Sequence, residues 1–449
     1  MLSLSLKTSE SSDNRLKAHG SRAIFALLLI ILFIAPFVLG GFRLWASALL
    51  CLAIAVVSAL HCAYAVTTQQ PLWNINKTHR WLIIPMLSCV FVVAMQDVLK
   101  LSASPGATRH ALLVTVALTL YAVLLLTYCT SYQRLRALVV LLVITGLVQA
   151  SYACILVLSP DLPSLVLQWQ RNDKAFGSFT YQNFLANYLG LVLSLGVGLI
   201  IAQLSTGQNP LSFKRLIQVW LSPKLMIRLA LMVMVIALIL TRSRMGNAAF
   251  FIALALACLL ALFFYRKPSK QFKWLIFSFF VLDFILIGAL FGVSQVKERL
   301  SNTALLFESR DEVLRDAWTL LFEHPFLGHG AGSFYTVFPS VQQGPYSGYY
   351  DNAHNDYLQF LIELGWPASI ALAVAVGGCL WVSVQVMKKR RTRLYQGLAF
   401  GAIAAIIFML LHASVDYSLQ AMANALTFIT VLCIGLLCKT LSPPVLARN

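Results

Sequence analysis

The chain has one long polar segment, Ser309 to Gly365, which ends with His354-Asn355-Asp356-Tyr357-Leu358-Gln359-Phe360-Leu361-Ile362-Glu363-Leu364-Gly365. This segment contains seven of the 16 acidic residues and three of the eight histidines, His324, His329 and His354. The whole chain has 59% hydrophobic residues and only 11% charged residues. Such a chain cannot hide its apolar surface in a soluble core, so we expect a membrane protein whose chemistry lies in the polar segment.

Apolar runs long enough to cross about 30 Å of hydrocarbon occur twelve times along the chain. They cover residues 23–40, 44–66, 81–96, 111–129, 137–158, 184–203, 225–241, 246–264, 274–293, 367–387, 396–413 and 421–438. The predicted fold class is therefore all-α: a polytopic bundle of about twelve transmembrane helices, with one large outer loop that contains short helices.

The basic residues responsible for the net charge of +18 are placed along the chain in a way that indicates which loops face the cytoplasm. The densest basic clusters, Arg266 to Lys273 and Lys388 to Arg393, fall in short loops that are cytoplasmic if the N-terminus is cytoplasmic. An even number of spans then places both termini in the cytoplasm. We therefore expect the lipid bilayer, and no nucleic acid, as the partner of these charges.

The predicted spans divide the chain into five parts. These are a cytoplasmic tail (1–22), spans one to nine (23–293), an outer catalytic loop (294–366), spans ten to twelve (367–438) and a second cytoplasmic tail (439–449). The first apolar run is expected to be retained as a span and not cleaved as a signal peptide. All nine cysteines lie in apolar runs or at their ends, so we interpret them as packing residues.

Two short helices are predicted in the outer loop. Ser309-Arg310-Asp311-Glu312 has the spacing of a capping box, so a helix should follow to about Glu323, where His324-Pro325 ends it. A second helix should begin with Asp351 or Asn352 as its N-cap.

The second loop helix should run to Leu364, with Gly365 as its C-terminal stop and Pro367 at the start of the next span. His354 would then lie in the first helical turn, where the helix dipole disfavours an imidazolium. Its ring is therefore expected to be neutral and able to accept a proton.

His354, Arg244 and Arg310 form the most informative combination. A neutral histidine near two outward-facing arginines suits attack by a hydroxyl on a phosphate-activated donor. The arginines would neutralise the leaving diphosphate, and the histidine would take the hydroxyl proton. Each residue also has a structural interpretation: His354 as a helix-cap residue bonded to the backbone, Arg244 as an interfacial snorkelling residue and Arg310 as part of the capping turn.

Other polar features carry weaker signals. Gly328-His329-Gly330-Ala331-Gly332 follows no strand and faces outward, so we do not expect it to bind a nucleotide. The spacings of the three loop histidines match no compact zinc site, so no metal is predicted. Asp283 is the lone acid inside a predicted span, where a hydrogen bond between helices is favoured over a proton-relay role.

Four stretches together resemble the motifs of the bacterial O-antigen ligase and O-antigen polymerase superfamily. In chain order they are Leu240-Thr241-Arg242-Ser243-Arg244, then Pro325-Phe326-Leu327-Gly328-His329-Gly330-Ala331-Gly332-Ser333-Phe334, then His354-Asn355 with Gly365 after nine further residues, and His412-Ala413-Ser414-Val415-Asp416-Tyr417. The resemblance depends on the order of the four stretches, their spacing and the side of the membrane on which each is expected. It covers roughly Gly177 to Cys438.

The resemblance implies a twelve-span protein of the bacterial inner membrane with its active site in a large periplasmic loop. Members of this superfamily move glycan chains from undecaprenyl diphosphate onto lipid A-core, onto another lipid-linked repeat unit or, in some branches, onto protein. They use no nucleotide sugar and no essential metal, so no cofactor is expected. His354 matches the loop histidine proposed as general base, and Arg244 and Arg310 match arginines proposed to engage the diphosphate.

Further substrate contacts are expected from Arg171, Arg242, Asn183, Asn355 and Tyr357. The chain also departs from the family pattern at two places. Ala368 stands where ligases commonly have Gly, Thr or Tyr, which leaves ligase and polymerase both open. Asn183 is the only asparagine in a stretch, Gly177 to Asn183, that often has two, which leaves the acceptor contacts open.

The predicted function is periplasmic transfer of an undecaprenyl-diphosphate-linked glycan to an acceptor hydroxyl by an inverting glycosyltransferase, with lipid A-core as the acceptor. A polymerase that joins lipid-linked repeat units is the alternative of the same class. A small-anion transporter is the alternative of a different class, which is disfavoured because the spans carry one acid and no path of paired charges.

Overall fold

The computed structural model describes residues 2–159, 161–164, 174–203, 223–265, 310–344 and 350–443. Within these ranges every regular element is a helix and no strand is present. The long helices are α1 (Leu2–Ile34), α2 (Leu44–Thr68), α3 (Arg80–Val98), α4 (Pro105–Tyr128), α5 (Tyr132–Leu158), α6 (Gln182–Ala202), α8 (Pro223–Leu240), α9 (Arg244–Phe264), α15 (Asp356–Lys389), α16 (Arg393–Ala413) and α17 (Met422–Thr440).

Ten of the described helices are long and apolar enough to span a membrane, and α8 adds a shorter apolar stretch, Leu225–Leu240. The predicted all-α polytopic fold is confirmed. Eleven of the twelve predicted spans correspond to these helices. The remaining predicted span, 274–293, lies outside the described residues, as does Asp283 within it.

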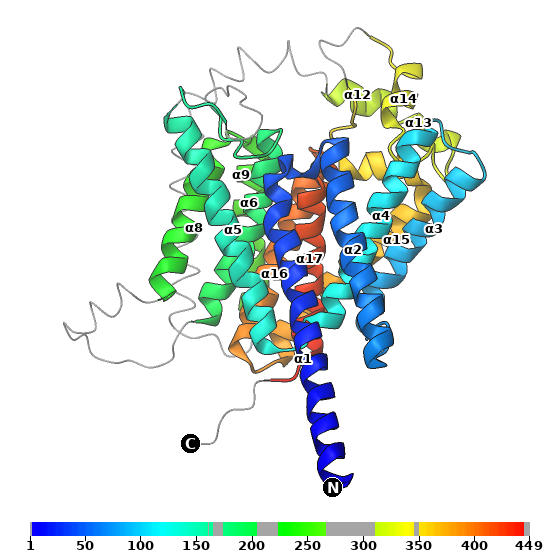
Figure 1. The fold of residues 1–449 in the computed structure, drawn as a ribbon. Coiled ribbons are helices and arrows are strands. Elements are labelled where there is room, and N and C mark those ends of the chain that lie inside the picture. The colour runs from blue at the N-terminus through cyan, green and yellow to red at the C-terminus, as the bar shows by residue number, and fades with distance from the viewer. Residues whose placement is uncertain are drawn as a thin grey trace, which may run out of the picture.

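Helices α6, α16 and α17 form the centre of the bundle (Figure 1). The apolar window of α6 is entirely buried, and those of α16 and α17 nearly so. Helices α1 to α5, α8, α9 and α15 surround them and expose large apolar side chains to the hydrocarbon. Because lipid is as apolar as leucine, this arrangement must be stabilised by close packing between helices and not by hydrophobic burial alone.

The contact between α6 and α16 depends on glycine. A Cβ added at Gly198 would lie 2.4 Å from the carbonyl oxygen of Gly397, and one at Gly397 would lie 2.4 Å from the carbonyl oxygen of Gly198. The two backbones therefore touch directly, as small residues allow in membrane helix pairs.

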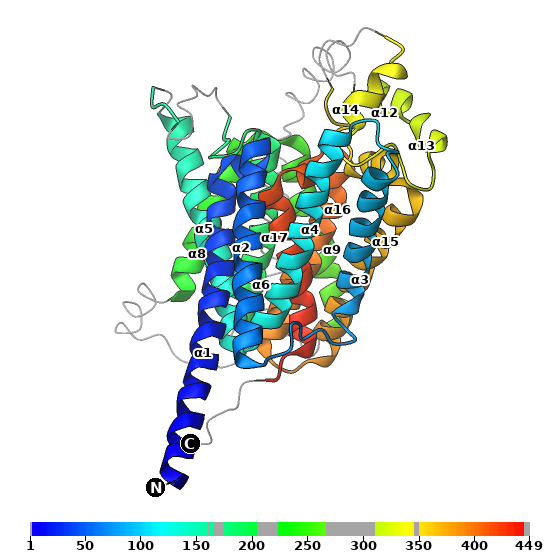
Figure 2. The same ribbon diagram turned by 45° about the vertical axis from the view of Figure 1, so that its right-hand side comes forward.

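The two ends of the bundle differ. The start of α1 and the end of α17 lie at one end, and the short helices of the polar segment lie at the other (Figure 2). These short helices are α12 (Arg310–Ala317), α13 (Leu320–Glu323) and α14 (Phe334–Val337), followed by the 3-10 turn η3 (Phe338–Ser340). We call the end that carries them the loop end.

The first predicted loop helix is present but interrupted. It is divided into α12 and α13 by a turn at Trp318 and Thr319, and it ends at Glu323, as His324-Pro325 predicts. The predicted cap, Ser309, lies outside the described residues.

The second predicted loop helix is the first part of α15, and its predicted start is wrong. The N-cap is Asn355, whose Oδ1 accepts a hydrogen bond from the backbone N–H of Leu358 at 3.1 Å. His354 therefore lies before the helix, with a left-handed φ of 50°, and not in its first turn. The helix-dipole argument for a neutral His354 ring consequently does not apply.

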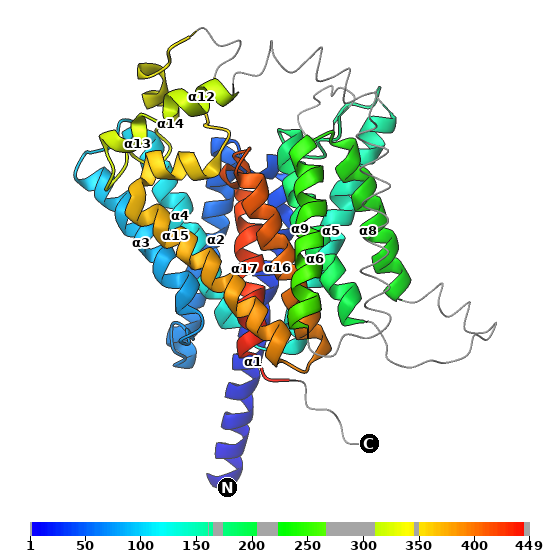
Figure 3. The ribbon, with the colours of Figure 1, turned by 180° about the vertical axis from the view of Figure 1, so that it is seen from behind.

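Gly365 divides α15 into two parts. Its φ of 76° and ψ of 173° are not helical, and Pro367 follows in the next turn. The first part of the helix lies across the loop end, and the second part crosses the bundle (Figure 3). The predicted helix end at Leu364 and Gly365 is therefore confirmed as a sharp bend.

Candidate active site

His354 lies in an aromatic cluster where four segments meet at the loop end. Its ring meets Tyr417 edge-on with centroids 4.6 Å apart, and Tyr350 with centroids 5.7 Å apart. Tyr417 belongs to the connection between α16 and α17 and also packs on Tyr181 and Phe184, just before and within α6. Rings from distant parts of the chain thus enclose a half-buried histidine.

Two buried carboxyl groups hold these segments together. Asp416 is 2% exposed, and its carboxylate accepts a hydrogen bond from Nδ2 of Asn183. Asp356 is 1% exposed and accepts from the backbone N–H of Leu419 at 3.2 Å. The backbone N–H of Asp356 in turn donates to the carbonyl of Asp416 at 3.1 Å. A buried carboxyl group without such donors would be strongly destabilising, so these bonds determine how the segments meet.

The residues predicted to bind substrate beside His354 have structural partners. Asn183 donates to Asp416 and, at 3.0 Å, to the hydroxyl of Tyr181. Asn355 caps α15 and donates from Nδ2 to the carbonyl of Ser414 at 2.9 Å. The hydroxyl of Tyr357 donates to the carbonyl of Leu410 at 2.7 Å. These bonds bring Asn183, Asn355 and His354 into one cluster.

The predicted arginines lie at the loop end as well. Arg244 is the first residue of α9, which Ser243 caps by accepting from the N–H of Gly246. A Cβ at Gly246 would lie 2.7 Å from that of Ala186, so Arg244 starts a helix that packs against the N-terminal part of α6. Arg242 precedes it with a φ of 53°, and both side chains are exposed.

Two further arginines were predicted from the sequence. Arg310 is the first residue of α12. Arg171 lies outside the described residues. That any of the four arginines binds an anion stays a prediction.

The glycine-rich turn binds the bend of α15. The N–H groups of His329 and Gly330 donate to the carbonyls of Ile362 and Glu363 at 2.9 and 3.2 Å. The backbone N–H of Gly332 donates to Oε2 of Glu363 at 2.8 Å. This motif therefore positions the helix that begins after His354.

Glycine is required in the turn because backbone approaches backbone. Gly328 and Gly330 have φ of 67° and 109°. A Cβ at Gly328 would lie 2.4 Å from the backbone carbonyl of Glu363, and one at Gly365 would lie 2.6 Å from that of Phe326. No larger residue fits these contacts without moving the backbone.

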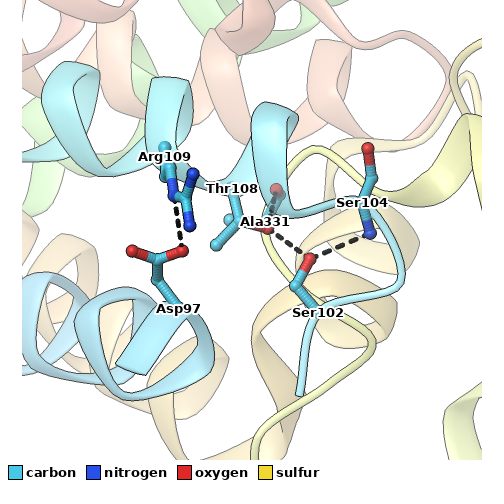
Figure 4. A network of polar contacts seen from close by, with 6 residues as sticks. All are labelled: Asp97, Ser102, Ser104, Thr108, Arg109 and Ala331. Carbon is cyan, nitrogen blue, oxygen red and sulfur yellow. Dashed lines mark hydrogen bonds and ion pairs between the residues drawn. The ribbon is translucent and has the colours of Figure 1, made fainter. Parts of the chain in front are cut away.

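The facing ends of α3 and α4 also hold the turn, and Figure 4 shows the contacts made by α4 and the connection before it. The hydroxyl of Thr108 donates to the carbonyl of Ala331 at 2.9 Å and lies 2.6 Å from that of Ser102. Gln96, which is completely buried, donates to the carbonyl of Glu363 at 2.7 Å and accepts from the N–H of Ala331 at 3.0 Å. The turn is thus fixed between α3, α4 and α15.

An apolar groove with a volume of about 800 Å³ adjoins the site. Its walls come from α2, α3, α4, α15, α16 and α17. Asp356, Tyr357 and Gln420 line it at the loop end, close in sequence to His354 and Tyr417. The histidine cluster therefore adjoins a groove that runs between membrane-spanning helices.

Several residues have roles that the sequence alone does not reveal. Glu363 and Gln96 were not identified, although a buried acid and amide among apolar residues are signals of internal hydrogen bonding. Asp356 lies inside the quoted motif, but its spacing cannot reveal a bond to Leu419. Tyr417 ends another quoted motif, and its contact with His354 depends on the packing of α15 against α16 and α17.

Comparison with known proteins gives one family. Residues 229–373 match the family model described as O-antigen ligase, a range that includes Arg242, Arg244, Arg310 and His354. The search of curated proteins found no match. Over this stretch, which contains the loop histidine and the bend of α15, the chain is similar to the O-antigen ligase family.

Proposed function

We propose that the protein is a bacterial inner-membrane glycosyltransferase that transfers an undecaprenyl-diphosphate-linked glycan to an acceptor hydroxyl on the periplasmic side. The proposed reaction is of the O-antigen ligase type, with lipid A-core as the acceptor. The observation that carries the proposal is the position of His354, which tyrosines hold at the loop end beside a groove between membrane helices.

In the proposed reaction, His354 acts as the general base. Its ring accepts the proton of the acceptor hydroxyl while the hydroxyl oxygen attacks the anomeric carbon of the donor sugar. The bond between that carbon and the diphosphate oxygen breaks, and the configuration at the carbon inverts. The polyprenyl diphosphate leaves with the electron pair of the broken bond.

Arg244 and Arg310 stabilise the departing diphosphate in this scheme, and Arg242 and Arg171 supplement them. An anion at this end of the bundle would account for basic residues on the side opposite the termini. The scheme relies on acid–base and electrostatic catalysis by the chain's own residues and uses no cofactor.

The test is complementation of a deletion strain with wild type, His354→Ala or His324→Ala, with equal amounts of each protein in the membrane. His324 is an exposed histidine in the same loop and serves as the matched control. His354→Ala should abolish glycan transfer, and His324→Ala should restore it. If His354→Ala restores the glycan fully, the assigned role is wrong.

The accumulated intermediate separates the two reactions of this class. Loss of long-chain glycan from lipid A-core with accumulation of lipid-linked polymer supports a ligase. Accumulation of a single lipid-linked repeat unit identifies a polymerase instead.

A further inference from the structure

The part of α15 that crosses the bundle marks the depth of the membrane boundary at the loop end. This part begins at Trp366, directly after the bend at Gly365, and ends with Lys388 and Lys389. Tryptophan and lysine at the two ends of a span are typical of residues at the boundaries between membrane and water. Trp366 is 38% exposed, so its ring reaches the surface of the bundle. Segments that pack on this residue from outside therefore lie at the boundary.

One segment of the loop is bonded to this boundary. The backbone N–H of Trp366 donates to the carbonyl of Pro325 at 2.8 Å. A Cβ added at Gly365 would lie 2.6 Å from the backbone carbonyl of Phe326, so the two backbones touch. Phe326 is nevertheless 75% exposed, because its ring does not turn inward. This ring is consequently presented to the surroundings at the depth of Trp366.

Helix α13 adds a second exposed phenylalanine. Leu320 and Leu321 are buried in a cluster with Phe334 and Leu358, whereas Phe322 is 65% exposed. Helix α13 lies beside the loop ends of α3 and α4 (Figure 1, Figure 3). Single exposed apolar residues are normal, but two exposed aromatic rings four residues apart and next to a membrane boundary indicate an interaction surface.

The end of α3 continues the same surface with two leucines and a lysine. Leu99 and Leu101 are 54% and 48% exposed, and Lys100 between them is exposed as well. The connection after α3 is bonded to the glycine-rich turn, since the N–H of Ala103 donates to the carbonyl of His329 at 2.9 Å. A lysine between two exposed leucines at the end of a span can lay its stem along apolar surface while its ammonium group reaches lipid phosphates.

We infer that Phe322 and Phe326, together with Leu99, Leu101 and Trp366, form an interfacial anchor that inserts into the head-group layer of the bilayer. The anchor is continuous with the lipid-facing surface of α3 and of the spanning part of α15. Its exposed aromatic and aliphatic side chains, with a cation beside them, match the chemistry of a phospholipid boundary. This inference does not depend on the proposed function.

The anchor also has a consequence for the site. The glycine-rich turn follows Phe326 almost directly, and its N–H groups bind the carbonyls of Ile362 and Glu363 in the first part of α15. That part of α15 begins two residues after His354. The depth at which the anchor sits in the leaflet therefore sets the height of the bend, and of the segment that carries His354, above the hydrocarbon.

The test measures the depth of nitroxide labels in the full-length protein, in nanodiscs of phosphatidylethanolamine and phosphatidylglycerol. In a cysteine-free background, Phe322→Cys, Phe326→Cys and Gly344→Cys are labelled one at a time. Gly344 is the matched control, because it lies in the same loop after two exposed glutamines and an added Cβ meets nothing within 4 Å. Labels at 322 and 326 should meet molecular oxygen, which concentrates in lipid, more often than a water-soluble nickel chelate. The label at 344 should show the reverse order.

Two outcomes would overturn the anchor. Access of the nickel chelate to positions 322 and 326 that equals its access to position 344 would place the two rings in water. Spin–spin broadening at 322 or 326 that disappears on dilution with unlabelled protein would assign the surface to a second copy of the chain. Thermal unfolding verifies that each labelled protein is folded.

A variant without cysteine tests what the anchor holds. Phe322→Ser combined with Phe326→Ser should make the loop more susceptible to protease in nanodiscs, because the rings no longer tie it to the leaflet. Tyr335→Ser is the control, since Tyr335 is an exposed aromatic residue of α14 in the same loop, and it should be cleaved at the wild-type rate. Cleavage of the double variant at the wild-type rate would show that the two rings do not hold the loop. All of these measurements need no substrate, so their outcome is independent of the result for His354→Ala.

Discussion

Tyr417 packs directly against the ring of His354. Its ring lies 4.6 Å from the histidine ring and also contacts Tyr181 and Phe184. An aromatic pair of this kind contributes about 0.5–1.5 kcal/mol beyond area burial. Tyr417→Ala should therefore slow glycan transfer by about two- to tenfold, whereas Tyr417→Phe should keep most of the rate.

Initial rates of transfer, with equal amounts of variant in the membrane, measure this effect. A Tyr417→Phe variant as slow as Tyr417→Ala would show that the hydroxyl, and not the ring contact with His354, is what matters.

We expect His329 to make the stability of the loop depend on pH. Burial lowers the pKa of His329 from its usual 6.5, outweighing the hydrogen bond to the carbonyl of Leu320 and the nearby carboxylate of Glu323. The folded state then binds fewer protons than the unfolded state, so stability falls as the pH drops through about 6.5. Protease resistance of the loop should decrease between pH 7.5 and 5.5.

His329→Gln is the control for this pH effect, because its amide can donate to Leu320 and does not titrate. The pH-dependent loss of protease resistance should be smaller in this variant. An identical pH dependence in both proteins would contradict the assignment to His329.

At the scale of elements, the glycine-rich turn restrains α15 at its bend. Gly328→Ala would force a side chain into a left-handed conformation and against the backbone of Glu363. Strain of this kind costs about 1–3 kcal/mol, apart from the clash itself. The variant should therefore show a lower unfolding temperature and faster proteolysis of the loop.

Gly344→Ala is the matched control, since a Cβ at Gly344 meets nothing within 4 Å. It should retain wild-type stability. Equal stability of the Gly328 and Gly344 variants would mean that the turn does not restrain α15.

Whether an element could be predicted from the sequence depends on the kind of interaction that defines it. The apolar runs and the bend at Gly365 were predicted because they depend on local composition and backbone preference. The start of α15 was predicted too early because Asp351, Asn352 and Asn355 are all good caps. Asn355 is the cap in the structure, where it also donates to Ser414 from the connection after α16.

For the whole molecule, the basic clusters predict which end of the bundle faces the cytoplasm. The start of α1 and the end of α17 lie at the end opposite the short helices of the polar segment (Figure 2). A fluorescent reporter fused to either terminus should fluoresce in the cytoplasm. In a cysteine-free background, Gly344→Cys should react with a membrane-impermeant maleimide in intact spheroplasts. Labelling of Gly344→Cys only after the membrane is permeabilised would reverse this topology.

Local patterns along the chain were enough to predict a helical membrane bundle, the bend at Gly365 and the motifs that resemble the superfamily. These features are local, because a backbone in hydrocarbon must satisfy its hydrogen bonds within each helix. The surroundings of His354, in contrast, come from segments that are far apart in the chain. Asn183 and Asp416 are 233 residues apart, and Gln96 reaches Glu363 across 267 residues. Such partners are selected by the packing of whole helices, which no local pattern of residues encodes.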